Sequence, residues 1–222
     1  MRLFVALVPP PDVLDELAEA VRPHLGTVSE LRWIRRDLLH VTLTFLDEVD
    51  DRTLERLLPR LERAVRRHER MTLSLAGAGA FPGNGAHARV LWTGLYGDRR
   101  ALARLAASTT AAGRRVGTIP DKHRGFRPHM TLARSRRPVD VRSLVEALSS
   151  FAGMPWTADT VQLVRSHLPG KDNTQLEYEP LMAWPLRHSS GGEGRGGRRP
   201  AGPRGRRSAR RRGAARRGRA GT

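Results

Sequence analysis

The 222-residue chain contains no cysteine, few aromatic side chains (5%) and no long apolar run. Without cysteine it can have no disulfide framework, thiolate zinc ligand, iron–sulfur cluster or cysteine nucleophile. No segment approaches the roughly 18 consecutive apolar residues that span a bilayer. The apolar residues 1–8 precede three prolines and lack a small-residue cleavage site, so we interpret them as a strand rather than a signal peptide. These absences predict a soluble cytoplasmic protein without membrane contact.

Positive charge is concentrated at one end of the chain. Residues 189–222 contain twelve arginines, one acid (Glu193) and no large apolar side chain. This segment therefore carries +11 of the formal net charge of +18, which leaves +7 for residues 1–188. Such a segment cannot offset the entropy of ordering, so we expect one domain over residues 1–188 followed by a disordered tail. The tail either adds RNA affinity without sequence preference or is an inert compositional extension.

The spacing of apolar residues predicts an α+β protein with antiparallel sheets, because strands and helices do not alternate as in a doubly wound sheet. We expect Asp12 and either Asp50 or Asp51 to cap helices, and Gly113 to end one. The arginines after Asp50 are interpreted as a solvated helix face; they are Arg56, Arg60, Arg63, Arg66 and Arg67. Strands are expected at residues 2–8, 31–34, 39–46, 71–78, 89–95, 129–133, 157–167 and 176–186. Helices are expected after Asp12, after Asp50 or Asp51, over residues 99–112 and from Pro138.

A tetrapeptide, His-x-Thr-Leu, occurs twice on predicted strands, at His40–Leu43 and at His129–Leu132. The composition of the chain predicts about 0.06 such matches by chance. In each half, the element is followed within ten residues by an Asp-capped amphipathic helix, which indicates a weak internal repeat. Because side chains alternate along a strand, each histidine shares a face with the threonine two residues later.

Two such strands facing one cleft supply a general base and a general acid, because imidazole titrates near neutral pH. Thr42 and Thr131 can donate hydrogen bonds to phosphoryl oxygens. In-line attack on a phosphodiester uses this set without a metal or cofactor. Either element alone would more often be structural. A zinc site is a further alternative, but neither strand carries nearby Asp, Glu or Cys ligands.

Strict alternation also assigns the neighbours of the motifs to faces. It puts Val41, Leu43 and Phe45 opposite His40, and it puts Ala133 on the same face as His129. Arg134 would then point away from His129 unless a β-bulge intervenes, yet its position beside the motif makes it a candidate phosphate ligand. Trp33 and Phe126 are candidates for stacking on a base.

These residues resemble the 2H phosphoesterase superfamily, and within it the bacterial and archaeal RNA 2′,3′-cyclic phosphodiesterases, or 2′-5′ RNA ligase family. The resemblance covers about residues 1–187 and includes the Arg-Leu-Phe-Val-Ala start, the Leu-His-Val-Thr-Leu-Thr-Phe-Leu stretch and the Arg-Pro-His-Met-Thr-Leu-Ala-Arg stretch. It also takes in residues 163–166 and the strand of Tyr178.

The resemblance implies a bilobal α+β fold, with two antiparallel-sheet lobes related by a pseudo-twofold axis around a central groove. It implies hydrolysis of RNA 2′,3′-cyclic phosphate ends to a 2′-phosphate, with a weak reverse 2′-5′ joining reaction. His40 would donate a proton to the 3′ leaving oxygen, His129 would activate water, and Thr42, Thr131 and Arg134 would bind substrate. We expect a monomer that binds no metal or cofactor. The alternatives are a non-catalytic RNA-binding protein and a 2H phosphoesterase acting on a small cyclic phosphate.

Overall fold

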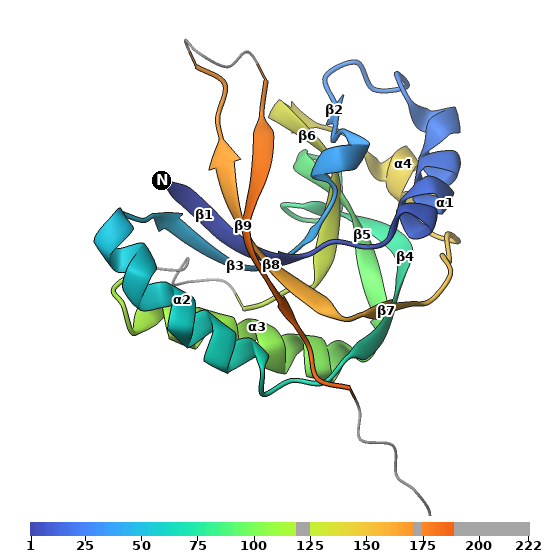
Figure 1. Cartoon of the computed structure of the whole chain (residues 1–222). Coiled ribbons are helices and arrows are strands. Elements are labelled where there is room, and N and C mark those ends of the chain that lie inside the picture. The colour runs from blue at the N-terminus through green and yellow to red at the C-terminus, as the bar shows by residue number, and fades with distance from the viewer. Residues whose placement is uncertain (119–124, 171–174, 189–222) are drawn as a thin grey trace, which may run out of the picture. The chain divides into compact units, whose positions relative to one another are not determined.

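The computed structural model describes residues 1–118, 125–170 and 175–188, and the rest of this section concerns that part of the chain (Figure 1). The expected basic tail, residues 189–222, lies outside the described residues, as does part of the loop expected before His129. The strands are β1 (Arg2–Leu7), β2 (Arg32–Trp33), β3 (Val41–Glu48), β4 (Met71–Phe81), β5 (Ala88–Gly97), β6 (His129–Val139), β7 (Trp156–Ala158), β8 (Thr160–His167) and β9 (Glu177–Pro185). The α-helices are α1 (Pro11–Val21), α2 (Asp51–Val65), α3 (Arg99–Arg114) and α4 (Arg142–Ala147), and 3₁₀ turns cover Arg22–His24 and Arg36–Leu38.

All of these strands belong to one antiparallel sheet, which confirms the predicted α+β class. The strand order is β7-β4-β5-β6-β3-β1-β8-β9, and β2 pairs with β6. The two halves of the sheet meet at β3 and β6, where the register contains a single pair, Val41 with Met130. The sheet therefore has two halves of four strands each, with β2 added to the half that contains β6, and one short contact joins them.

The two halves are related by an internal repeat of the chain. The order β1, α1, β3, α2, β4 is repeated as β5, α3, β6, α4, β8. The last strand of each repeat pairs with the first strand of the other, because β4 pairs with β5 and β8 pairs with β1. The repeat expected from the sequence thus corresponds to two interlocked units with pseudo-twofold symmetry.

The helices pack on the sheet through apolar stripes at helical spacing. On α2, Leu57, Leu61 and Val65 recur every four residues and are fully buried. Figure 1 shows α2 and α3 side by side below the sheet, with α1 and α4 on the other side. None of the helices in the described ranges is long and apolar enough to span a membrane.

The helix boundaries agree with the sequence at one end and differ at three others. The helix expected from Pro138 begins only at Arg142, and Pro138 lies in β6. Asp50 caps α2, since its carboxylate accepts from the Thr53 amide at 2.6 Å. Asp12 is not a cap; it lies in the first turn of α1, which begins at Pro11. Gly113 does not end α3, because the helix continues for one more residue and Gly113 is buried. The chain turns instead at Gly117, where φ is +88°.

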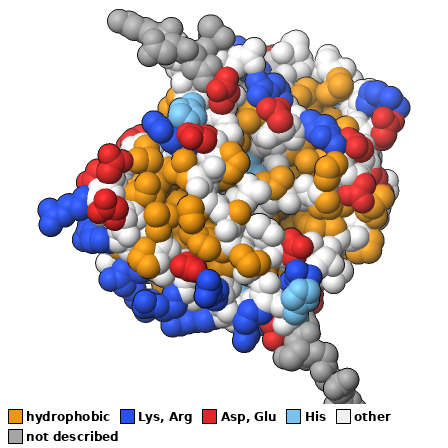
Figure 2. Space-filling view, viewed as in Figure 1, with side chains coloured by type: hydrophobic (Ala, Val, Ile, Leu, Met, Phe, Trp, Pro, Cys, Tyr) orange, Lys and Arg blue, Asp and Glu red, His pale blue; other side chains and the backbone are white. Residues whose placement is uncertain are grey.

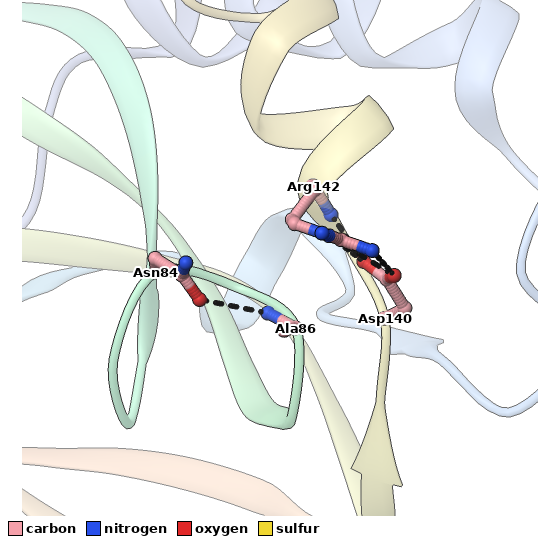
Figure 3. A network of polar contacts seen from close by, with 4 residues as sticks. All are labelled: Asn84, Ala86, Asp140 and Arg142. Carbon is pink, nitrogen blue, oxygen red and sulfur yellow. Dashed lines mark hydrogen bonds and ion pairs between the residues drawn. The ribbon is translucent and has the colours of Figure 1, made fainter.

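The β4–β5 connection holds the start of α4 (Figure 3). The Asn84 side chain accepts from the Ala86 amide at 3.2 Å, and the Val141 amide donates to the Gly85 carbonyl at 2.8 Å. Arg142 pairs with Asp140 at 2.6 Å and lowers the pKa of that carboxyl to about 2. The strand expected over residues 71–78 extends to Phe81, and Gly77 and Gly79 lie inside β4, where the register with β5 shifts.

Gly97, at the end of β5, lies close to the main chain of β4. Its φ is +92°, and an added Cβ would lie 2.2 Å from the Thr72 carbonyl oxygen, whereas a Cβ on Gly117 meets nothing within 4 Å. We expect Gly117→Ala to lower the free energy of unfolding by about 1–2 kcal/mol through backbone strain alone, and Gly97→Ala by about 1–3 kcal/mol more through overpacking. Urea denaturation of both variants measures the difference, and equal losses would contradict the assigned clash.

Candidate active site

The single pairing between β3 and β6 brings the two His-x-Thr elements together. Val41 and Met130 are partners and both are fully buried. Their neighbours on either side, His40 and Thr42 on one strand and His129 and Thr131 on the other, are half-buried. Antiparallel pairing places each histidine across from the threonine of the other motif. Elements 89 residues apart in the chain thus form one four-residue cluster.

Equivalent β-bulges follow both motifs and change which residues face the cluster. Against β5, Trp92 pairs with Thr131 but Leu91 pairs with Ala133, so Leu132 is an extra residue in β6. Against β1, Ala6 pairs with Thr42 but Val5 pairs with Thr44, so Leu43 is an extra residue in β3.

Three face assignments made from strict alternation are wrong for this reason. Arg134 returns to the face of His129, which is the condition under which it could contact a phosphate. Phe45 returns to the face of His40 and is 55% exposed instead of packing against a helix. Ala133 is fully buried rather than on the histidine face. The bulges leave a cation on one side of the cluster and an exposed phenyl ring on the other.

The charge of Arg134 affects the pKa values of three side chains that lie on or next to three different strands. Its guanidinium contributes to lowering the pKa of His40 and of His129, and it opposes the rise that burial causes in the pKa of the Tyr178 hydroxyl. These effects fall off with distance, so Arg134 lies near all three side chains. A bound anion would therefore meet a positive charge near both imidazoles.

Both imidazoles are held by the same main-chain contact. Nδ1 of His40 lies 2.8 Å from the Leu38 carbonyl oxygen, and Nδ1 of His129 lies 2.7 Å from the Arg127 carbonyl oxygen. Because a carbonyl can only accept, each Nδ1 carries a proton, and Nε2 is the nitrogen that can gain or lose one. The sequence gives no sign of these bonds, since they depend on how the chain bends before each strand.

The surroundings of the two rings disfavour the charged imidazolium. Burial lowers the pKa of His40 to about 4; the Leu38 carbonyl opposes this change, while the charges of Arg134 and His129 add to it. Burial also lowers the pKa of His129, with the Arg127 carbonyl opposing and Arg134 adding. At neutral pH both rings are therefore neutral in the free protein.

Aromatic side chains hold each imidazole in place. The His40 ring lies 4.7 Å from that of Phe4 and 5.3 Å from that of Tyr178, measured between centroids. The His129 ring lies 5.1 Å from that of Phe81. Sequence analysis did not assign Phe4, Phe81 or Tyr178 to the site, although Phe4 and Tyr178 fall in the stretches that carry the resemblance.

A cavity of about 790 Å³ extends from His129 across the face of β4 and β5, and we call it the β4–β5 groove. Its floor is made of small residues: Ser74, Ala76, Gly77, Ala78 and Gly94. His129 lines the groove, whereas His40 does not. One wall is fixed by main-chain bonds, because the Gly77 amide donates to the Phe151 carbonyl and the Gly153 amide donates to the Leu75 carbonyl, both at 2.8 Å.

The rim of the β4–β5 groove combines rings and cations. Tyr96 (60% exposed), Phe126, Phe151, Arg99 and Arg127 line it, and the Arg127 guanidinium lies 5.9 Å from the centre of the Phe81 ring. Of the two stacking candidates from the sequence, Phe126 is therefore at the site. Trp33 packs against the core from β2.

Metal binding would need a cluster of ligands near the histidines. Among the described residues, no three His, Asp or Glu side chains are placed so that they could hold a metal ion. The two histidines therefore have no carboxylate or third imidazole within the described ranges to complete such a site.

The fold and the twofold-related His-x-Thr strands define the class of the 2H phosphoesterases. The chain belongs to the 2′-5′ RNA ligase superfamily, whose family model matches residues 9–169. It is 36% identical over 154 residues to an RNA 2′,3′-cyclic phosphodiesterase of Archaeoglobus fulgidus, covering 68% of this chain and 82% of that protein. It is 32% identical over 201 residues to an RNA 2′,3′-cyclic phosphodiesterase of Thermus thermophilus, covering 87% and 94%. The crystal structure of E. coli LigT complexed with 3′-AMP superposes with a TM-score of 0.67 at 26% identity, covering 83% of this chain and 97% of that one.

Removing the charge of Arg134 tests whether this charge acts on both the His40 and the His129 imidazole. We expect Arg134→Gln to raise the pKa of both His40 and His129, because the guanidinium disfavours protonation of each imidazole. NMR titration of the histidine ring protons measures both values. Arg137→Gln, an equal loss of charge on the same strand, should leave them unchanged; similar shifts in both variants would contradict the assignment.

Proposed function

We propose that this protein hydrolyses the 2′,3′-cyclic phosphate ends of RNA to 2′-phosphates by acid–base catalysis with His40 and His129. The observation that carries the proposal is the pairing of Val41 with Met130, which sets two half-buried imidazoles, each tied through Nδ1 to a carbonyl, beside two threonines and Arg134. The curated relatives named RNA 2′,3′-cyclic phosphodiesterase support the substrate class.

In the proposed reaction, water attacks phosphorus in line with the 3′ oxygen. Nε2 of His129 accepts the proton of the attacking water as the new P–O bond forms. Nε2 of His40 donates a proton to the 3′ oxygen as the P–O3′ bond breaks. Proton balance is kept, because one imidazole ends protonated and the other neutral, and exchange with solvent restores the pair. This order of roles follows the resemblance to the family.

The remaining polar groups of the cluster stabilise charge on the phosphate. The hydroxyls of Thr42 and Thr131 donate to the non-bridging oxygens, and Arg134 offsets the charge that builds on them. No step uses a metal ion. The diester anion also supplies the negative charge that favours protonation of His40, whose pKa is about 4 without a ligand. Substrate binding thus prepares the acid that the reaction needs.

RNA, rather than a small cyclic phosphate, is the substrate class that the β4–β5 groove favours. Its small-residue floor leaves room beside the phosphate. The exposed ring of Tyr96, two half-buried phenyl rings and two arginines on its rim suit bases and phosphates of a single strand. An RNA 5′-hydroxyl that takes the place of water would form a 2′-5′ linkage as the P–O3′ bond breaks. This joining would be reversible, because the same acid–base pair works in both directions. The basic tail would add affinity that depends on salt.

Replacement of either histidine tests the catalytic proposal. We expect His40→Ala and His129→Ala each to lower kcat for a nucleoside 2′,3′-cyclic phosphate in EDTA by about a hundredfold or more, because each removes one proton transfer. His87→Ala, an exposed histidine outside the cluster, is the control. Near wild-type turnover in either variant would contradict the acid–base roles. Binding without turnover in the unmodified protein would favour a non-catalytic RNA-binding protein, and activity lost only with EDTA would favour a metal site.

The β4–β5 groove predicts that its rim residues contribute to binding of an oligonucleotide but not of a mononucleotide. We expect Tyr96→Ala and Arg99→Ala to raise KM for a cyclic-phosphate oligonucleotide by about tenfold, because one stacked ring or charged contact is worth roughly 1–3 kcal/mol. KM for the mononucleotide should stay unchanged. Arg100→Ala, on the same helix but outside the groove lining, is the control. Equal effects on both substrates would mean that the groove does not hold the rest of the strand.

A further inference from the structure

A second cavity lies between helices α2 and α3 and is lined mainly by arginines and alanines. It has a volume of about 300 Å³, and we call it the α2–α3 cleft. Its lining consists of Arg60, Arg63, Ala64, Arg67, Ala107, Ser108, Ala111, Ala112 and Arg115. Four guanidinium groups thus border one small space, and no acidic side chain does.

The sequence explains how the arginines come together. Arg60, Arg63 and Arg67 are spaced three and four residues apart, so they share one face of α2 and its C-terminal end. Arg115 follows the last turn of α3 and approaches from the other helix. The alanines between them are too short to fill the space. The arginines of α2, interpreted from the sequence as a solvated face, therefore include three that border a cavity.

Among the described residues, no carboxylate neutralises the charge of the α2–α3 cleft. Helix α3 contains no Asp or Glu over Arg99–Arg114. The nearest acid on α2, Glu62, pairs with Arg66 at 2.6 Å, and Arg66 does not line the cleft. Within the described ranges, none of the four lining arginines forms an ion pair with a carboxylate. Figure 2 shows Lys and Arg side chains gathered along the lower edge of the molecule, over α2.

Like charges around one space repel each other, so an anion bound there removes an energetic cost as well as making new contacts. The cleft also offers a hydroxyl donor. Ser108 Oγ lies 2.9 Å from Nε2 of His68, and a serine can accept from that ring while it donates to a phosphate oxygen. Several guanidinium forks with a hydroxyl match a ligand that carries several phosphates better than a single carboxylate.

The cleft is separate from the histidine cluster. Helix α3 packs against β3 through Thr44, whose hydroxyl lies 2.7 Å from that of Thr109 and 2.9 Å from that of Thr110. The α2–α3 cleft and the β4–β5 groove have no lining residue in common. A ligand in the α2–α3 cleft therefore does not contact the reacting phosphate.

We propose that the α2–α3 cleft is a second anion site, which binds a chain of phosphate groups. The phosphates come either from an RNA backbone or from a free oligophosphate, since both present closely spaced anionic oxygens to the guanidinium groups. The proposal does not depend on the reaction at His40 and His129.

Tripolyphosphate binding to the full chain, measured by calorimetry at fixed salt, tests this site. The variant Arg63→Ala/Arg67→Ala removes two lining arginines. The matched control, Arg52→Ala/Arg56→Ala, removes the same charge from the same helix outside the cleft and keeps the same tail. We expect Kd to rise about tenfold or more in the first variant and less than threefold in the control, because only the first variant loses two charged hydrogen-bond donors to the anion. Equal changes in the two variants, or no measurable binding to the unmodified protein, would overturn the proposal.

A second measurement distinguishes the two sources of phosphate. A single-stranded RNA with a 3′-hydroxyl end is titrated against the same variants. A parallel loss of RNA affinity in the cleft variant assigns the site to the RNA backbone, and loss of tripolyphosphate binding alone assigns it to a free oligophosphate. Turnover of a nucleoside 2′,3′-cyclic phosphate should be unchanged in the cleft variant. If the unmodified protein shows no turnover, the proposed function fails, while the ratio of Kd values still decides the second site.

Discussion

The site depends on one short antiparallel contact, in which Val41 of β3 pairs with Met130 of β6. Each half of the sheet is completed by the last strand of the other repeat, so the halves are interlocked and this contact is held from both sides. The buried pair faces the core, and the four side chains next to it face the opposite way. A relative shift of the two strands by one residue would separate the histidines from the threonines.

Pseudo-symmetry accounts for the two equivalent histidines, but differences between the halves of the sheet give the two histidines different surroundings. The bulges at Leu43 and Leu132 are equivalent, yet they present Phe45 on one side and Arg134 on the other. The β4–β5 groove, with its floor of small residues, is lined by His129 and not by His40. The two imidazoles are thus held alike by carbonyls but face different surroundings, which is what an acid and a base with separate tasks require.

Burial and charge set the resting state of the pair. Two half-buried rings near a guanidinium lose their protons at neutral pH, so the free protein presents two acceptors to an incoming ligand. In the proposed reaction, an anionic diester would favour protonation of one of them, His40. The same reasoning supports the proposed anion site in the α2–α3 cleft, whose arginines pair with no carboxylate in the part of the chain that the structure describes.

The sequence by itself determined the secondary structure class, the His40–Thr42 and His129–Thr131 pairs and a helix cap at Asp50 or Asp51, because periodicity and capping are local properties; the structure selects Asp50. It could not determine on which face of the sheet Phe45, Ala133 and Arg134 lie. A β-bulge changes the face of the residues that follow it, and its position depends on how the strand pairs with its partner strand. Tertiary packing alone likewise decided three other features. They are the end of α3 beyond Gly113, the carbonyl partners of the His40 and His129 rings, and the position of three α2 arginines around the α2–α3 cleft. Each of them joins segments far apart in the chain, and no local pattern records such a contact.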